Sequence, residues 1–170
     1  MTASPAPDSA ATSSAPGPDQ RHGTPGGKRF CDTRIGDQFG RVERITARHL
    51  DEGARLIGDY NPLHVDEAFA ARSRHGARIL HGVVTSAIVG AEFGMVYAGT
   101  AIGYLQHDAR FHAPVKIGDE LTITWTVTAL EPKPRHDGGI VTAEAVAVNQ
   151  HGVTVCTAHG RMLVANDLVA

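Results

Sequence analysis

Residues 81–97, HGVVTSAIVGAEFGMVY, carry a helical pattern that is apolar on most of its sides. Apolar side chains recur along this stretch at helical spacing, at Val83, Val84, Ala87, Ile88, Ala91 and Met95. Small residues (Ala, Gly and Ser) fill most of the positions between them. A helix of this kind has almost no polar face to present to water, so we predict that it is largely buried.

The chain that follows this helix is strand-like. Residues 121–128 alternate strictly, with threonine at every second position, and the apolar positions that share one face are Leu121, Ile123, Trp125 and Val127. Turn-forming residues separate this strand from two further runs, residues 140–148 and 153–164, and residues 38–45 form a weaker first strand. We therefore predict an α+β fold in which an antiparallel sheet wraps around a central buried helix.

The chain between the first strand and the buried helix is rich in helix boundaries. The apolar spacing over residues 46–57 predicts a short helix that ends at Gly58. Residues 58–66, GDYNPLHVD, are dense in turn formers, and we expect a non-helical loop there. Asp66 is placed to cap a second short helix that continues through Ala71.

Composition indicates one soluble domain preceded by a tail. The chain has 170 residues, 42% hydrophobic and 20% charged, with a formal net charge of −2, which gives no electrostatic case for nucleic-acid binding. No apolar run is long enough to cross a membrane, and two cysteines form no disulfide framework, so we expect a cytoplasmic protein. Residues 1–28 lack large apolar side chains and are predicted to be a disordered tail, with residues 29–170 as the domain.

The loop at residues 58–66 also carries the residues most suited to chemistry. Asp59 and His64 lie five positions apart across a turn that contains Pro62, and together they could hold one water molecule and exchange protons with it. Gly82 begins the buried helix, where a free backbone N–H could stabilise the oxygen of an enolate. The same residues also fit purely structural roles: Asp59 and His64 in turns and caps, Asn61 in side-chain-to-backbone hydrogen bonds, and His81 as an ordinary buried histidine.

These residues resemble the signature of one enzyme family. Asp59-x-Asn61-Pro62-x-His64-x-Asp66, followed by residues 79–82 (ILHG), is similar to the motif of R-specific enoyl-CoA hydratases, the hydratase-2 or MaoC-like group. The similarity continues through residues 68–70 and 110–121 and spans roughly residues 35 to 165. The resemblance implies a hot-dog fold, usually assembled as a homodimer. It also implies syn addition of water to a trans-2-enoyl thioester, or the reverse dehydration.

The resemblance assigns roles residue by residue. Asp59 is the base that activates water, His64 orients this water and helps to deliver the proton, and Gly82 supplies an oxyanion-hole N–H. The resemblance also implies that no metal and no bound organic cofactor are needed, and that coenzyme A or an acyl carrier protein carries the substrate. We count Asn61 and Phe93 as candidate substrate-binding residues. Bulky Phe93 would shorten the acyl pocket, whereas Gly90, where some relatives carry a serine, would open space beside it.

Several alternatives remain open from the sequence. A hot-dog acyl-CoA thioesterase would share the fold, but it has no need of the Asp–His pair. A non-catalytic acyl-binding hot-dog subunit would be expected to lose one member of the pair. The histidines elsewhere fit no familiar metal-ligand spacing. Four basic residues are equally consistent with contacts to coenzyme A phosphates and with a solvated face: Arg72, Arg74, Arg78 and Lys116. The carrier, the chain length, and the choice between fatty-acid metabolism and other pathways are not fixed by these patterns.

Overall fold

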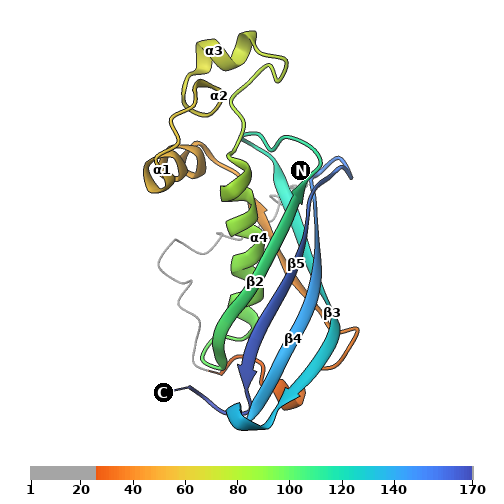
Figure 1. Cartoon of the computed structure of the whole chain (residues 1–170). Helices are drawn as coiled ribbons and strands as arrows, with labels where there is room; N and C mark the ends of the chain where they lie inside the picture. The colour runs from red at the N-terminus through yellow and green to blue at the C-terminus, as the bar shows by residue number, and fades with distance from the viewer. Residues whose placement is uncertain (1–25, 170) are drawn as a thin grey trace, which may run out of the picture.

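The computed structural model describes residues 26–169, in which one long helix lies against a curved sheet and three shorter helices gather beyond its N-terminal end (Figure 1). The helical elements are η2 (Phe30–Asp32), α1 (Ala47–Ile57), α2 (Pro62–Val65), α3 (Glu67–Arg72), α4 (Gly82–Val96) and η3 (Pro134–His136). The strands are β1 (Gln38–Arg44), β2 (Ala101–Phe111), β3 (Glu120–Lys133), β4 (Gly138–Val148) and β5 (Thr154–Ala165). None of the helices in this part of the chain has the length and apolar character that a bilayer crossing requires.

The five strands form one antiparallel sheet in the order β1-β3-β4-β5-β2. The alternation predicted for residues 121–128 is confirmed, because Leu121, Ile123, Trp125 and Val127 are all buried. Strand β2, at one edge of the sheet, escaped prediction as a separate element. Its apolar and polar residues do not alternate cleanly, and its pairing with β5 is interrupted by two register shifts.

Helix α4 packs its buried side into the concave face of the sheet, as predicted for the central helix (Figure 1). Phe93 of α4 stacks on Trp125 of β3 with ring centroids 4.8 Å apart, and the Trp125 indole N–H donates to the main-chain oxygen of Val89 at 2.9 Å. This contact between a helix carbonyl and a sheet side chain fixes the height of the helix along the sheet.

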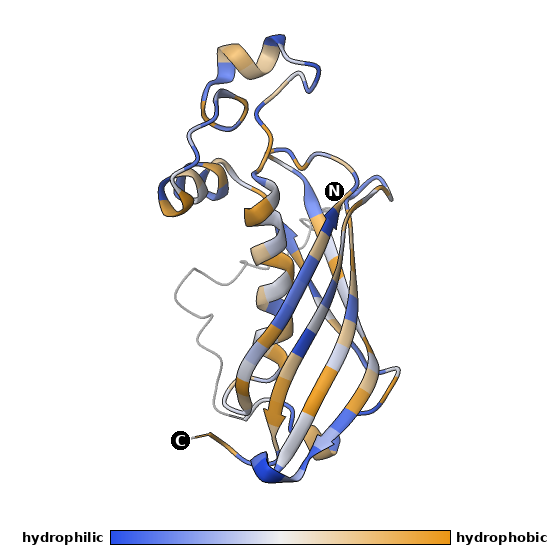
Figure 2. Ribbon diagram, viewed as in Figure 1, coloured by the Kyte–Doolittle hydropathy of each residue, from blue (hydrophilic) through white to orange (hydrophobic). Residues whose placement is uncertain are grey.

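The prediction that α4 is buried on most sides is only partly confirmed. Most of the helix is coloured white to orange in Figure 2, so its apolar character continues around it. One stripe nevertheless faces outward in the single chain, formed by Val83, Ala87, Ala91 and Met95. The sheet is wide enough to cover only one side of the helix, which is why an all-apolar helix retains an exposed apolar stripe.

The helices before α4 begin and end where local chemistry dictates. Helix α1 ends at Gly58, which adopts the left-handed conformation (φ 72°) that glycine tolerates best. The side chain of Asp66 accepts from the Phe69 N–H and caps α3, as predicted. The prediction that residues 58–66 form a non-helical loop is wrong for the middle of this range, because Pro62 starts the single helical turn α2. Proline suits the first position of a helix, where its missing N–H leaves no bond unmade.

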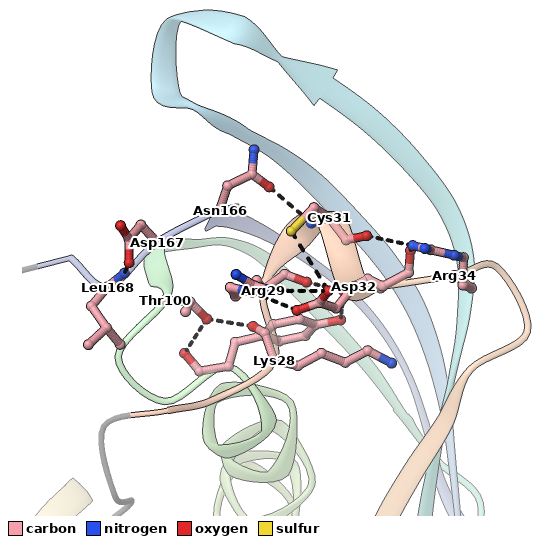
Figure 3. A network of polar contacts seen from close by, with 11 residues as sticks. Lys28, Arg29, Cys31, Asp32, Arg34, Thr100, Asn166, Asp167 and Leu168 are labelled. Atoms are coloured by element: carbon pink, nitrogen blue, oxygen red, sulfur yellow. Dashed lines mark hydrogen bonds and ion pairs between the residues drawn. The ribbon is translucent and has the colours of Figure 1, made fainter.

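The opposite end of α4 is closed by segments from both ends of the described chain (Figure 3). Residues 1–25, most of the predicted disordered tail, lie outside the described residues. Gly27 and Lys28, which we assigned to that tail, donate backbone hydrogen bonds to the oxygens of Ala98 and Val96 at 2.8 Å each. Asn166 accepts from the Cys31 N–H at 2.9 Å and so joins the C-terminal segment to the same cluster. Gly27 and Lys28 therefore pack with the domain.

Candidate active site

The loop after α1 holds Asp59 and Asn61 in two consecutive local turns. The Asn61 N–H donates to Oδ1 of Asp59 at 3.0 Å, and the Leu63 N–H donates to Oδ1 of Asn61 at 3.1 Å. The second of these bonds caps α2. Asn61 thus has the structural role that its residue type favours, and its assignment to substrate binding stays a prediction.

His64 is oriented by a single hydrogen bond at the back of its ring. Its Nδ1 lies 2.7 Å from the main-chain oxygen of Ile79, so this nitrogen carries the ring hydrogen and donates it. The opposite nitrogen, Nε2, faces Oδ2 of Asp59 at 3.9 Å. In the neutral ring Nε2 is an acceptor, and the carboxylate is also an acceptor, so the two atoms cannot bond directly.

The Asp59–His64 gap has the chemistry of a water site. A separation of 3.9 Å is too long for a hydrogen bond but suits one bridging water. A water between two acceptors donates one hydrogen to each and keeps its oxygen lone pairs free. The structure therefore brings together the two residues that the sequence predicted to converge, in an arrangement suited to aiming a water oxygen.

His81 touches both members of this pair. Its Nε2 donates to the main-chain oxygen of Asp59 at 2.9 Å, and its ring lies against that of His64 with centroids 3.8 Å apart and planes tilted by 31°. The side chain is buried, but its Nδ1 has no hydrogen-bond partner within residues 26–169. The interpretation of His81 as an ordinary satisfied histidine is therefore incomplete. Its position directly before Gly82 in the motif was the signal that could have revealed its place in the site.

Asp59, His64 and His81 are also of the donor types that bind transition metals, and they lie close enough together to be considered as a ligand set. The hydrogen bonds argue against ligation in the observed arrangement. The Nε2 of His81, the ring nitrogen that faces Asp59, gives its hydrogen to the Asp59 carbonyl and so has no lone pair left for a metal, while Nδ1 lies toward Gly53 of α1. These residues fit the handling of water better than the binding of a resident ion.

Gly82 places the start of α4 beside His64. Both residues line a pocket of about 360 Å³ together with Arg74, His75, Ile79, Leu80, Thr85 and residues 111–115. The Gly82 N–H, at the first position of the helix, meets no acceptor within the described chain. A side chain at this position would come within 3.1 Å of the Phe111 ring, so glycine allows β2 to approach the helix. The site therefore offers one free N–H donor for a developing negative oxygen.

The structure does not bring Phe93 to this pocket. Phe93 is fully buried in the core, between Phe39 and Trp125. Its role in substrate binding remains a prediction that these contacts do not support. The open space expected beside Gly90 is also absent in the described chain. A Cβ at Gly90 would lie 3.1 Å from the His107 ring.

A polar network fills the space beside Gly90. His107 Nε2 lies 2.7 Å from the Ser86 hydroxyl, and its Nδ1 lies 2.9 Å from the Tyr104 hydroxyl. Burial lowers the pKa of His107 and raises the pKa of Tyr104 to about 12. Sequence reasoning missed this network because Ser86 of α4 meets Tyr104 and His107 of β2 only in the folded chain, and the three share no spacing pattern.

The four basic residues near the motif separate into different groups. Arg78 is bound to Asp51 and Glu67 at 3.0 and 3.2 Å, and its placement is therefore structural. Lys116 donates to the main-chain oxygen of His75. Arg74 lines the pocket that contains His64 and Gly82, whereas Arg72 does not. Of the four, Arg74 is the one placed to meet an anionic part of a bound molecule.

Comparisons with known proteins agree with the motif and the fold. The family model described as MaoC like domain matches residues 38–149. A 3-hydroxybutyryl-CoA dehydratase of Methylorubrum extorquens is 39% identical over 106 residues, covering 62% of this chain and 68% of the relative. An (R)-specific enoyl-CoA hydratase of Aeromonas caviae is 32% identical over 123 residues, covering 72% and 89%.

The solved structures confirm the predicted hot-dog fold. An unliganded R-hydratase from Pseudomonas aeruginosa superposes with a TM-score of 0.73 and 29% identity, covering 83% of this chain and 88% of that one. The R-hydratase structure from Aeromonas caviae gives a TM-score of 0.68 at 28% identity, covering 78% and 97%. The family match, which includes the Asp59–His64 loop and Gly82, and the shared fold lead to one conclusion: the chain belongs to the MaoC-like domain family.

Proposed function

We propose that the protein is an R-specific hydro-lyase that adds water to trans-2-enoyl thioesters or removes it from R-3-hydroxyacyl thioesters. The observation that carries this proposal is the pair of acceptors, Asp59 Oδ2 and His64 Nε2, facing each other at 3.9 Å, with His64 lining the same pocket as Gly82 and its free N–H. A hydration site needs both features: a held water, and a donor for the oxygen that becomes negative during addition.

The proposed chemistry follows from which atoms give and accept hydrogen. Asp59 accepts a proton from the water while the water oxygen bonds to the β-carbon of the substrate. His64 holds the second hydrogen of this water and so fixes the direction of attack. The electrons of the double bond move toward the thioester carbonyl, whose oxygen is stabilised by the Gly82 N–H. The proton then passes from the Asp59–His64 pair to the α-carbon on the same face, which completes a syn addition.

We propose coenzyme A as the carrier of the substrate. Two observations support this choice: the relatives compared above are named for CoA thioesters, and Arg74 presents a cation to the catalytic pocket. The phosphates of coenzyme A are suitable partners for such a cation. The alternative carrier is an acyl carrier protein with the same thioester arm, and the first experiment must distinguish it from coenzyme A.

We further propose that two copies assemble as a homodimer in the cytoplasm. The exposed apolar stripe of α4 supports the assembly, as does the edge strand β2 with its exposed Ile102, Leu105 and Phe111. Sedimentation analysis should give twice the monomer mass, and a monomer at micromolar concentration would contradict the assembly. The cytoplasmic assignment is supported by Cys31 and Cys156, both free thiols.

The deciding experiment measures the loss of enoyl-thioester absorbance when crotonyl-CoA is added to the protein. Asp59→Asn keeps the acceptor for the Asn61 N–H, and His64→Asn keeps a donor at the position of Nδ1, so both variants preserve the local bonds. Each should reduce kcat by about 10²–10⁴-fold without a comparable fall in melting temperature. His159→Asn, on the face of β5 away from α4, is the control and should retain full activity.

The products distinguish the proposal from its rivals. R-3-hydroxybutyryl-CoA identifies the proposed hydratase, whereas release of free thiol with the double bond intact would identify a thioesterase. Activity only on the enoyl carrier-protein thioester would replace coenzyme A as the carrier. Folded protein that is inactive on both carriers and still binds them would indicate a non-catalytic acyl-binding subunit.

A further inference from the structure

We propose that His81 is a positioning residue for the hydration reaction, because its buried ring holds the Asp59 main chain and the His64 ring in register with the start of α4. This inference rests on the proposed function, since it concerns the water held by Asp59 and His64. His81 contacts both residues while its own backbone belongs to the helix cap. It therefore links the three parts of the site through one side chain.

The backbone of His81 is fixed by the first turn of α4. Its main-chain oxygen accepts from the Thr85 N–H at 3.0 Å and from the Thr85 hydroxyl at 3.2 Å. Thr85 is itself buried and lines the catalytic pocket. Because two donors of Thr85 bind the main-chain oxygen of His81, the backbone of His81 is held as part of α4 and not as part of the preceding loop.

The side chain of His81 connects α4 to the loop that carries Asp59. The side chain of Asp59 is half-exposed, and among the described residues its carboxylate accepts one hydrogen bond, from the Asn61 N–H two positions further on. The Nε2–H of His81, at 2.9 Å, is the contact that ties the main chain of Asp59 to α4 across 22 residues of sequence. Loss of this donor would leave the Asp59 end of the loop held by local turns, while the other end stays bonded to Ile79 through Leu63 and His64.

The ring of His81 constrains the second member of the pair in a different way. Its plane lies under the His64 ring at 3.8 Å, while the His64 Nδ1–H···O bond to Ile79 sets the rotation of that ring. Together the stack and the bond leave Nε2 of His64 with one direction in which to point. That direction is the 3.9 Å gap to Asp59.

The hydrogen bonds of His81 indicate that it acts by position and not by proton transfer. Its Nε2 must carry hydrogen to donate to Asp59, and its Nδ1 is enclosed without a partner in the described chain. Nδ1 lies close to α1, where a Cβ added to Gly53 would come within 3.6 Å of this nitrogen. We therefore place no reaction step on His81.

Two matched variants separate the two contacts. His81→Gln keeps an N–H donor at the reach of Nε2 and removes the ring. His81→Phe keeps a ring against His64 and removes the donor. Because misplacing a reacting group by about 1 Å can cost on the order of 10²-fold, we expect His81→Phe to lower kcat roughly 10–100-fold with little change in KM. His81→Gln should recover most of the lost kcat.

Stability measurements keep this test decisive. The kcat of His81→Phe must be measured well below its melting temperature, with circular dichroism confirming the fold. If His81→Phe does not fold, His81→Asn replaces it, because its shorter amide cannot reach the Asp59 carbonyl and should show the same loss of kcat. Wild-type kcat in either folded variant that lacks the donor would overturn the proposal, as would equal losses in the Gln and Phe variants.

Hydrogen–deuterium exchange gives a readout that does not depend on activity. Amides of residues 58–66 should exchange at least several-fold faster in His81→Phe than in wild type, and His81→Gln should stay close to wild type. If the three proteins show these exchange rates but the wild type does not hydrate enoyl thioesters, the proposed function fails, while the contact of His81 with the Asp59 loop stands. If wild type is active and neither exchange nor kcat responds to loss of the donor, the positioning role of His81 fails alone.

Discussion

The two ends of α4 are treated in opposite ways by the rest of the chain. At the C-terminal end, the main-chain oxygens of Val96 and Ala98 accept hydrogen bonds from Lys28 and Gly27, and Tyr97 is fully buried. At the N-terminal end, the N–H of Gly82 meets no acceptor within residues 26–169 and lies in the wall of an open pocket.

This difference indicates that the C-terminal end of α4 contributes to stability, whereas the N-terminal end is available for the proposed function. Every helix leaves unpaired N–H groups at its start and unpaired C=O groups at its end. Here polar contacts from distant segments close the carbonyl end, and the amide end stays free within the described residues, as the proposed oxyanion role of Gly82 requires. An unsatisfied donor beside a pocket costs some stability but is available to stabilise a negative oxygen. Four experiments test this division.

The largest effect is expected in the core on the C-terminal half of α4. Phe93→Ala removes a fully buried ring that stacks on Trp125, and it should lower the free energy of unfolding by about 3–5 kcal/mol. Guanidinium unfolding measures the loss, with half-exposed Phe69→Ala as a control that should lose less than half as much. The same variant tests whether Phe93 limits chain length. An unchanged ratio of octenoyl-CoA to crotonyl-CoA rates would count against that sequence-based prediction.

The next effect concerns activity at the N-terminal end. Gly82→Pro removes the N–H at a helix position that proline tolerates, and His81 before it already has the extended conformation (ψ 135°) that proline requires. Gly82→Ala, which keeps the N–H and shares the crowding against Phe111, is the matched control. We expect kcat for crotonyl-CoA hydration to be about 10²–10³-fold lower in the proline variant than in the alanine variant. Equal kcat values would remove Gly82 from the oxyanion role.

A smaller effect is expected from removing the ion pair that lies beside the closure at the C-terminal end. Lys28 is paired with Asp37, and this hydrogen bond lowers the pKa of the Asp37 carboxyl below its ordinary value of 3.8. Lys28→Gln should reduce stability by about 1 kcal/mol or less at neutral pH and leave kcat unchanged. Since a lowered carboxyl pKa stabilises the fold above pH 3.8, the difference between wild type and variant should vanish as the pH falls through the lowered value. A difference that persists at lower pH would point to lost packing instead.

The smallest effect belongs to His107, between the two ends. Burial lowers its pKa below the ordinary 6.5, so the unfolded chain binds a proton in an interval of pH where the folded protein does not. Stability should therefore decline as the pH falls below 6.5, and the decline from this group should stop below the lowered folded-state pKa. Thermal unfolding of wild type and His107→Gln between pH 7.5 and 5 measures it. The variant should show a shallower decline, and parallel curves would exclude His107 as the titrating group.

The sequence determined those parts of the protein that depend on neighbouring residues. Strict alternation placed one face of residues 121–128 in the core, and Gly58 and Asp66 marked helix boundaries because turn and cap chemistry is local. The motif around Asp59, His64 and Gly82 identified the family, since several residue types recur together at set distances. Proline at the first position of α2 was misread because it suits a helix start as well as a turn.

The tertiary structure alone decided which distant groups meet. The exposure of one stripe on an all-apolar helix depends on how far the sheet extends around it. The burial of Phe93 and the occupation of the space beside Gly90 by His107 depend on the packing of β2 and β3 against α4. The contacts of His81 with Asp59 and His64 join residues 22 and 17 positions apart. The spacing of neighbouring residues cannot predict such contacts, because they form only when the chain folds back on itself and buries its apolar surface.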